Sequence, residues 1–374
     1  MKIAIIGPAY PYRGGIANFS ERLAYELQLE QDDVQLFTFN MMYPNFLFPG
    51  KTQYAESVLQ FPLEITQNIN SINPFNWWRV GRYIQKQNFD LIIIPYSIPF
   101  LAPSLGFIAR IIKRNNFTKV LSIVHNLHPH EKRFGDKFLS NFFLKSCDAF
   151  LTLSLKVKED ILGIRSNAKV TVSNHPIYDT FGTIIEKQKA KNQLNLEESK
   201  QYILFFGLVR AYKGLDILID AMSIVAPQNP NIQLLIAGEF YGDYPKYLAQ
   251  IEALNLSERI VVINQFVPED KVNSYFCAAD IVVQPYKNAT QSGITQICYH
   301  FNKPMIVTNV GALAENVVNN HVGFVCEPSK ETVAASILRF YQEEKEVIFI
   351  ENIKEEKKKY SWRVLSQQIR SVFK

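Results

Sequence analysis

Short, almost wholly apolar runs alternate with stretches of helical periodicity, and this alternation restricts the possible folds most. The runs in the first half lie at 2–7, 34–39, 91–95, 119–124, 149–154 and 169–173. Those in the second half lie at 202–207, 232–238, 259–263, 280–285 and 304–308. Such strands, separated by helical stretches such as 16–29 and 133–146, are typical of a parallel sheet covered on both faces. Two series predict an α/β protein with two doubly wound, Rossmann-like domains.

A polar segment, 183–200, separates the two series and is predicted to be the interdomain linker. The first domain would then span 1–182 and the second 201–350, which suits a chain of 374 residues. In the charged tail, Trp362, Leu365 and Ile369 are spaced along one helical face. We therefore expect a helix over about 358–374 that packs on the first domain.

The composition excludes several classes of protein. Aromatic residues make up 13% of the chain, which argues against disorder. The four cysteines lie far apart without a CxxC pair, which argues against a zinc ribbon or a disulfide scaffold and fits a reducing cytosol. No signal peptide is evident, so we expect a cytoplasmic protein. The uncharged run 91–109 is long enough to span a membrane, but three prolines interrupt it, and we interpret it as strand, loop and helix.

The net charge of +5 lies entirely in the first half and is too small for a dedicated nucleic-acid binder. Residues 1–180 hold 19 Lys and Arg against 14 Asp and Glu, whereas the remainder holds 21 of each. A basic half can meet a phosphate, an acidic glycan or an anionic lipid, or can simply be solvated surface.

Two glycines open the first helical stretch. Gly14 and Gly15 precede a helix that begins near Ile16. They can let backbone N–H groups approach a phosphate or a sugar closely, with a plain turn as the alternative. Gly7 and Gly14 are too far apart for a dinucleotide fingerprint, and no clear acidic residue ends the second strand, so a dehydrogenase is disfavoured.

The sequence HNLHPHE (125–131) follows the strand 119–124 and contains three histidines. It lacks HExxH spacing, and Pro129 breaks the helix that such ligands need, so we predict no metal site. His125 directly follows the strand and can reach into an interdomain cleft, which makes it a candidate catalytic residue. His128 and His130 are interpreted as loop or core residues.

The second half of the chain contains stronger evidence for a ligand-binding site than the first. Arg210 and Lys213 flank the turn after its first strand, and Gly214 opens the next helix. Two cations at the carboxyl end of a strand, beside a helix N-terminus, suit a diphosphate. They oppose the helix dipole, so stability alone does not explain them.

Further polar residues follow the other strands of this half. Ser292 is a good helix N-cap, and Gly293 permits the close approach of a ligand. Gly311 and Glu315 follow the strand 304–308, and Glu239 follows the strand 232–238. Each carboxylate could accept hydrogen bonds from sugar hydroxyls, or Glu315 could simply cap a helix.

A set of motifs follows one another along the chain. They are GGIANFSERLAYEL, VHNLHPHE, NHPIYDTFG, FFGLVRAYKG, IAGEF, FVPEDKVNSYFCAADIVVQPY, SG before a helix, KPMIVTNVGALAE and YSWRVL. This ordered set resembles the family 4 retaining glycosyltransferases, and the resemblance covers the whole chain. It implies the GT-B fold, in which two Rossmann-like domains face each other across a cleft and the last helix crosses back to the first domain. The second domain would bind a nucleotide-sugar donor and the first an acceptor.

The family pattern is altered at three positions. Leu208 stands where an arginine is usual, and Arg210 is the plausible substitute. Two glutamates of the family correspond to Ala289 and Ile297. Nearby polar residues that could replace them in donor binding are Thr290, Gln291, Ser292 and Gln296.

The resemblance implies transfer of a hexose-type sugar from a nucleoside diphosphate to a hydroxyl, with retention of anomeric configuration. No metal and no separate cofactor would be needed, and Arg210 and Lys213 would stabilise the diphosphate as it leaves. The acceptor would be a glycan or a lipid-linked glycan in cell-surface polysaccharide or glycolipid synthesis. UDP and GDP both remain open. A GT-B nucleotide-sugar epimerase and a catalytically silent sugar-binding protein are the alternatives.

The basic first half also suggests peripheral contact with an anionic membrane. Arg110, Lys113, Arg114 and Lys119 cluster in the sequence. The resemblance implies lipid-linked acceptors at the cytoplasmic face. We therefore expect salt-sensitive binding to anionic vesicles.

Overall fold

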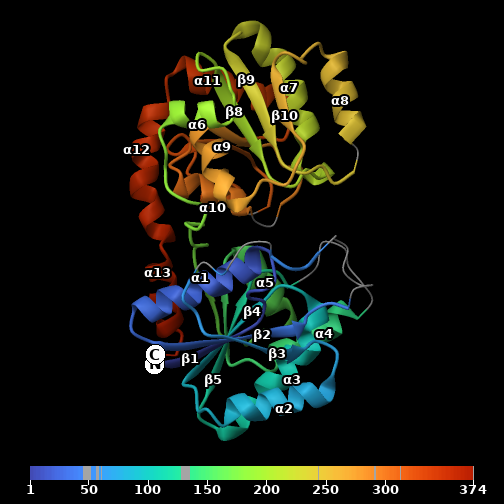
Figure 1. Ribbon diagram of the computed structural model, residues 1–374, viewed down its shortest axis with the longest axis vertical. Helices are drawn as coiled ribbons and strands as arrows, with labels where there is room; N and C mark the ends of the chain where they lie inside the picture. Colours follow the sequence, from blue (N-terminus) through green and yellow to red (C-terminus); the bar gives the residue numbers. More distant parts are fainter. Residues whose placement is uncertain are drawn as a thin grey trace. The chain divides into compact units, whose positions relative to one another are not determined.

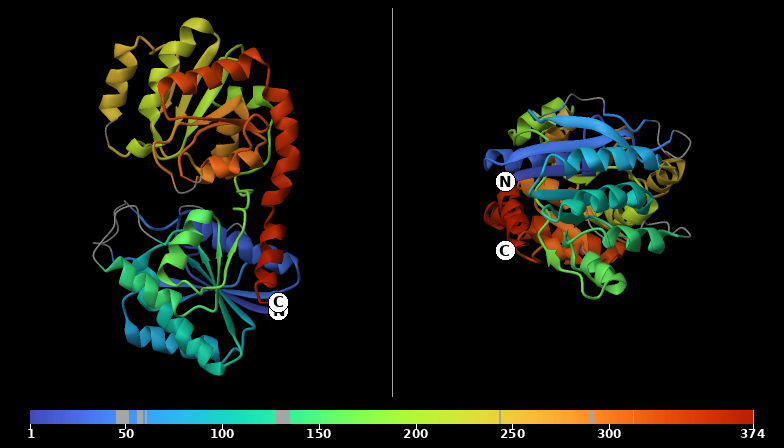
Figure 2. Two further views of the ribbon diagram at one scale, coloured as in Figure 1. Left: turned by 180° about the vertical axis from the view of Figure 1, so that it is seen from behind. Right: turned by 90° about the horizontal axis from the view of Figure 1, so that it is seen from below.

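The computed structural model describes residues 1–44, 52–55, 59, 61–127, 135–242, 244–289, 292–311 and 313–373. The chain forms two compact units, shown in Figures 1 and 2. Unit 1 comprises Met1–His175 together with Trp362–Lys374, and unit 2 comprises Pro176–Ser361.

Unit 1 is built on a seven-stranded sheet in the order β3-β2-β1-β4-β5-β6-β7, in which every neighbouring pair is parallel. Its strands are β1 (Lys2–Ile6), β2 (Asp33–Met41), β3 (Ile65–Asn70), β4 (Leu91–Tyr96), β5 (Lys119–Val124), β6 (Ala149–Thr152) and β7 (Val170–Val172). Successive side chains of β1 enter two different apolar clusters, Ile3 and Ile5 on one face and Ala4 and Ile6 on the other. Both faces are therefore covered, as apolar parallel strands require.

The helices of unit 1 divide between these two faces. The helices α1 (Gly15–Leu29) and α13 (Trp362–Ser371) cover one face. The other face is covered by α2 (Pro74–Gln85), α3 (Ala102–Ile112), α4 (Asp136–Leu144) and α5 (Leu155–Ile164). Leu91–Ala109 forms strand β4, a 3-10 turn at Pro99–Leu101 and most of α3, as the three prolines predict. Among the described residues, no helix is long and apolar enough to cross a membrane.

Unit 2 contains a six-stranded parallel sheet in the order β10-β9-β8-β11-β12-β13. Its strands are β8 (Gln201–Phe206), β9 (Ile232–Ala237), β10 (Ile260–Ile263), β11 (Ile281–Gln284), β12 (Met305–Thr308) and β13 (Gly323–Cys326). The chain winds outward from β8 to β10 and then returns to β11 beside β8. This reversal makes β8 and β11 a topological switch point, where open α/β sheets bind ligands.

Helices cover both faces of this sheet as well. One apolar cluster joins it to α7 (Leu215–Gln228), α8 (Tyr244–Ala253) and α11 (Lys330–Gln342). The other joins it to α6 (Lys187–Gln193), α9 (Val272–Ala278) and α10 (Gly293–His300). The helix α12 (Glu346–Glu356) contributes to both clusters through Phe349 and Ile353. The predicted α/β class with two Rossmann-like domains is confirmed.

The unit boundary lies at Pro176, upstream of the predicted linker 183–200. That segment contains α6, whose Lys187 forms ion pairs with Asp280 at 2.7 Å and Glu346 at 2.5 Å. Because these ties attach α6 to β11 and α12, the segment is part of unit 2. Residues 183–200 are polar because positions of the helix within them are exposed, and not because they form a linker.

The tail helix is shorter than predicted and lies within unit 1, beside α1 (Figure 2). The residues expected to begin it, Lys357–Tyr360, form a 3-10 turn in unit 2. The Trp362 ring packs 5.1 Å from the Phe19 ring, between centroids. Arg370 donates to Glu30 at 2.7 Å and to Asp32 at 2.6 Å. The buried Trp362 ring and the ion pairs of Arg370 thus hold α13 against α1 and the start of β2.

We expect Trp362→Ala to lower the free energy of unfolding of unit 1 by about 3–5 kcal/mol, because it removes a buried ring without refilling the space. Urea unfolding followed by circular dichroism measures this change. The control Arg363→Ala alters an exposed residue of the same helix and should have little effect. Equal stability of Trp362→Ala and the wild type would show that α13 does not support unit 1.

Candidate functional site

The loops after four strands of unit 2 meet at the carboxyl edge of its sheet. The Val209 N–H donates to the Glu239 carbonyl at 2.9 Å, and the Lys287 N–H donates to the Tyr212 carbonyl at 2.7 Å. These bonds tie the loop after β8 to the loops after β9 and β11. A Cβ atom added to Gly311 would lie 1.6 Å from the Ala289 carbonyl oxygen, so the loop after β12 also approaches closely. This contact requires glycine.

Lys213 lies at the centre of this edge, at the end of a 3-10 turn, Ala211–Lys213. It is only 9% exposed, and its Nζ forms no hydrogen bond or ion pair with the described residues. The ammonium stands 5.7 Å from the centroid of the Tyr286 ring. Burial, assisted by the charge of Arg210, lowers the pKa of Lys213 to about 8. A buried ammonium without a carboxylate is unfavourable by itself and favours the binding of an anion.

Arg210 is the second cation of this turn, and it is exposed. Its guanidinium lies 4.7 Å from the centroid of the Tyr241 ring, in the loop after β9. Among the described residues it forms no ion pair, so its donors remain available to a ligand. The structure therefore brings together the two cations that the sequence predicted to act together.

The N-terminus of α10 lies beside Lys213. A Cβ atom built on Gly207 would lie 3.2 Å from the Lys213 Nζ and 3.4 Å from the Ile294 Cδ1. Ser292 is the N-cap residue, as predicted, but its hydroxyl makes no capping bond. It donates instead to the Gln284 Oε1 at 2.6 Å. The first-turn N–H groups of α10 and the Lys213 ammonium together form an environment suited to phosphate.

The positions of the two missing glutamates are filled by apolar packing. Ala289 and Ile297 are buried in the core of unit 2. Gln296 beside them is 1% exposed, and its Oε1 accepts no hydrogen bond from the described residues. Thr290 and Gln291 lie outside the described residues.

Three further candidates lie in unit 2. Gly293 begins α10, and a Cβ atom there would lie 3.0 Å from the Tyr178 Cε2, so this glycine leaves room for an aromatic ring. Glu239 and Glu315 are exposed after β9 and β12, and neither carboxylate forms an ion pair with a described residue. Both remain predictions as donor-binding residues.

In unit 1, Gly14 and Gly15 form the exposed N-terminus of α1. Gly14 has φ 117°, and a Cβ atom added there would meet nothing within 4 Å. The predicted open glycine turn at a helix start is therefore present. Its role in ligand binding stays a prediction.

His125 follows β5 directly and is buried, with its ring edge-on to Phe19 at 4.6 Å. Burial, and to a smaller extent His175, lowers the pKa of His125 to about 3. The imidazole is therefore neutral near pH 7, and its Nε2 has no hydrogen-bond partner among the described residues. This chemistry suits a neutral hydrogen-bonding group better than a cationic acid.

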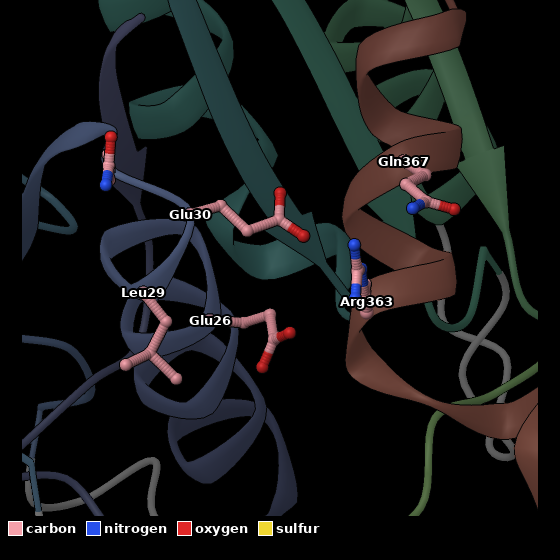
Figure 3. Close-up of a pocket in the computed structure, with 6 residues that line it drawn as sticks. Glu26, Leu29, Glu30, Arg363 and Gln367 are labelled. Carbon is pink, nitrogen blue, oxygen red and sulfur yellow. The ribbon is translucent and has the colours of Figure 1, made fainter.

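A groove of about 550 Å³ in unit 1 lies elsewhere, between the C-terminal half of α1 and α13 (Figure 3). It is lined by Glu26, Leu29, Glu30, Gln31, Arg363 and Gln367. Because α1 begins after β1 and runs back along the sheet, this groove is remote from the helix N-terminus at Gly14. Charges of both signs line it, and we assign it no catalytic role.

Within the described part of the chain, no group of three or more His, Cys, Asp or Glu side chains could hold a metal ion. His128 and His130 lie outside the described residues.

Two residues of the site were not predicted from the sequence. Gln284 ends β11 and is buried, and Tyr286 contacts both Lys213 and the Ser292 hydroxyl, the latter at 3.3 Å. A single polar residue that ends an apolar strand was the available signal for Gln284. Tyr286 gave none, because a tyrosine after a strand is usually part of the core.

Comparison with known proteins defines the class. The chain aligns along its whole length, at 16% identity and a TM-score of 0.75, with the Anabaena protein HepE in complex with UDP, and covers 99% of that chain. It is 23% identical over its full length to an uncharacterised glycosyltransferase of Methanocaldococcus jannaschii, covering 98% of it. It is 26% identical over 203 residues to a GDP-mannose:glycolipid 4-beta-D-mannosyltransferase of Xanthomonas campestris, which is 54% of each chain.

These comparisons and the two parallel sheets define a GT-B glycosyltransferase fold. The family described as glycosyl transferases group 1 matches residues 186–359, which include every strand and the cationic turn of unit 2. Through this segment, somewhat less than half of its length, the chain resembles the group 1 glycosyltransferases.

We expect Lys213→Met to raise the melting temperature of the ligand-free protein at pH 7, because it removes a buried, unpaired charge but keeps the length of the side chain. The unfolded chain binds more protons than the folded chain between the folded pKa of about 8 and the ordinary lysine pKa of 10.5. Wild-type stability therefore rises in this window relative to the variant. The advantage of Lys213→Met should be largest below pH 8 and fade toward pH 10.5.

Differential scanning calorimetry of both proteins from pH 7 to pH 10.5 measures this difference. Groups common to the two proteins cancel in the comparison. A variant that is less stable than the wild type by the same amount at every pH would show that Lys213 is a structural residue.

Proposed function

We propose that the protein transfers a sugar from a nucleoside diphosphate to a hydroxyl of a glycan or a lipid-linked glycan, with retention of anomeric configuration. The observation that carries this proposal is the buried, uncompensated ammonium of Lys213 beside the N-terminus of α10. Unit 2 would bind the donor and unit 1 the acceptor. The name of the Xanthomonas relative gives GDP-mannose and a glycolipid as its substrates, and HepE was solved with UDP, so both nucleotides are candidates.

Lys213 and Arg210 act in this proposal on the leaving group. As the bond between the anomeric carbon and the phosphate oxygen breaks, negative charge develops on the diphosphate. The buried Lys213 ammonium, the exposed Arg210 guanidinium and the first-turn N–H groups of α10 stabilise this charge. The new bond forms between the acceptor oxygen and the same face of the anomeric carbon, and the departing phosphate takes the acceptor proton.

The altered positions bear on donor recognition. With apolar side chains at 289 and 297, two carboxylates that the family resemblance leads one to expect are missing. The buried Gln296 amide and the Gln284–Ser292 pair are described polar groups close to these positions in the chain. We infer that amide and hydroxyl groups replace carboxylates in holding the sugar or the ribose. Thr290 and Gln291 are further candidates from the sequence.

His125 enters the proposal as a neutral group. Because its pKa of about 3 keeps the imidazole uncharged, it can hydrogen-bond to a sugar hydroxyl without attracting the phosphate. The same property disfavours an epimerase in which this histidine would act as a charged acid.

The four described cysteines are free, which supports placing the activity in a reducing cytoplasm.

The second candidate function is sugar binding without turnover, which the apolar residues at 289 and 297 favour. Incubation with a panel of UDP- and GDP-sugars and a glycan or lipid-linked acceptor distinguishes the two. A transferase releases free nucleotide and yields a product with the anomeric configuration of the donor, which NMR assigns from the one-bond coupling between C1 and H1. Binding without nucleotide release supports the silent protein, and a product of inverted configuration contradicts retention.

We expect Lys213→Ala to lower turnover by about 100-fold or more, the effect of losing one contact to the developing charge. Stabilisation by free nucleoside diphosphate, measured as a thermal shift, should fall, while stabilisation by the bare nucleoside should not. Lys246→Ala is the matched control, because Lys246 is an exposed lysine on α8 of the same unit. Unchanged turnover and diphosphate affinity in folded Lys213→Ala would remove Lys213 from the site.

A further inference from the structure

The outward face of α2 in unit 1 has an unusual composition for a protein surface. Its residues recur at spacings of three and four, which places them along one side of the helix. They are Phe75, Trp78, Arg79, Arg82 and Tyr83. All five are exposed, with Phe75 at 87% and Trp78 at 55%. The opposite side of α2 packs into the core through Val80 and Ile84.

The position of this face is fixed at the start of the helix. The Asn73 side chain caps α2 by accepting from the N–H groups of Phe75 at 3.0 Å and Asn76 at 3.2 Å. The Asn76 side chain donates to the Asn68 carbonyl and accepts from the Asn70 N–H, each at 2.8 Å. These bonds anchor α2 to strand β3, so the aromatic side chains project from a rigid support.

The same composition continues onto α3, which lies beside α2 over the sheet (Figure 1). The Trp77 and Phe107 rings, 6.0 Å apart, join the two helices. Phe107 and Arg110 are exposed on α3, and Arg114 and Phe117 are exposed just after it. We call the exposed residues of α2 and this segment the α2–α3 face. It contains no acidic residue.

The four arginines of the α2–α3 face form no ion pair with any described residue. Arg82 donates to the Gln85 Oε1 and Arg110 to the Phe142 carbonyl, so neither charge is neutralised. Lys113 of the cluster expected from the sequence differs, because it pairs with Asp148 at 2.5 Å. The face therefore combines large apolar rings with uncompensated positive charge.

We propose that the α2–α3 face binds the surface of an anionic lipid bilayer. Aromatic rings prefer the interface between lipid headgroups and acyl chains, and arginines attract anionic headgroups. Charge complementarity selects this occupant over a second copy of the chain, since two such faces would oppose arginine to arginine. The proposal extends the expected Arg110–Lys119 cluster to α2, where the aromatic anchors lie, and it does not depend on the transferase activity.

Co-sedimentation of the full-length protein with two kinds of vesicle tests the proposal. Phosphatidylcholine vesicles that contain 30% phosphatidylglycerol should bind the protein at low salt. Pure phosphatidylcholine vesicles should bind it much more weakly, and 0.5 M NaCl should reduce binding to the anionic vesicles. Equal binding to both compositions, or none to either, overturns the proposal, as does tighter binding to a single-stranded oligonucleotide than to anionic vesicles.

Two double variants separate the contributions of charge and aromatic rings. Arg79→Ala with Arg82→Ala should weaken binding to anionic vesicles by about 30-fold. Phe75→Ala with Trp78→Ala should weaken it by about tenfold or more. All four side chains are exposed, so folding should be preserved, and circular dichroism checks this.

Matched controls lie in unit 2. Lys246→Ala with Lys330→Ala removes the same charge from other exposed positions, and Val347→Ala with Ile348→Ala removes exposed apolar side chains of α12. Neither control should change binding. If the controls weaken binding as much as the α2 variants do, the interaction is a general charge effect and the assigned face is wrong.

Tryptophan fluorescence gives an independent test of contact. Of the three tryptophans, Trp362 is buried, Trp77 is half-buried and Trp78 is exposed. Brominated phosphatidylcholine mixed into the anionic vesicles should quench the wild type, and most of this quenching should vanish in Trp78→Phe, which still binds. Quenching that persists unchanged in Trp78→Phe would place the contact away from α2.

Discussion

The parallel arrangement of the strands in unit 2 is the constraint on which the candidate site depends. All strands end at one edge, so residues far apart in the sequence converge there without any special contact between the elements that carry them. The reversal between β8 and β11 leaves room at this edge because the chain leaves in opposite directions on the two sides. Backbone hydrogen bonds and close glycine contacts then fix the loops. The packing of these loops buries Lys213, although no described acidic side chain pairs with it.

The cost of burying Lys213 connects stability with function. Its ammonium lies near Arg210 and a helix N-terminus, both electrostatically unfavourable for a cation, while Tyr286 provides only a modest cation–π contact. The core of unit 2 supplies the stability that keeps this charge in place. In the proposed function, a diphosphate would meet a Lys213 ammonium that is already buried, so little reorganisation would be needed. The proposed stabilising groups would then be in position before charge develops.

The sequence predicted the fold well wherever a strand is buried on both faces, because such strands are apolar throughout. It failed at β3, an edge strand whose residues, ITQNIN, are mostly polar, and at β13, one of the two edge strands of the other sheet. An edge strand has only one neighbour and needs fewer buried side chains. The helix α6 was missed for a related reason, since Ala190 is its one residue in the apolar cluster and its sequence, KQKAKNQ, looks like a linker.

The residues of the candidate site also divide into those that the sequence predicted and those that it missed. Cations after a strand are visible in a sequence because they conflict with the local dipole, so Arg210 and Lys213 were found. Gln284 and Tyr286 were not found, because their importance depends on what folds against them.

The α2–α3 face is a third case. Its aromatic residues suggest a core helix in the sequence, and the structure is needed to show which side of α2 the sheet takes. Because Val80 and Ile84 pack into the core, the exposed rings and arginines of α2 lie on the side of the helix that faces away from the sheet.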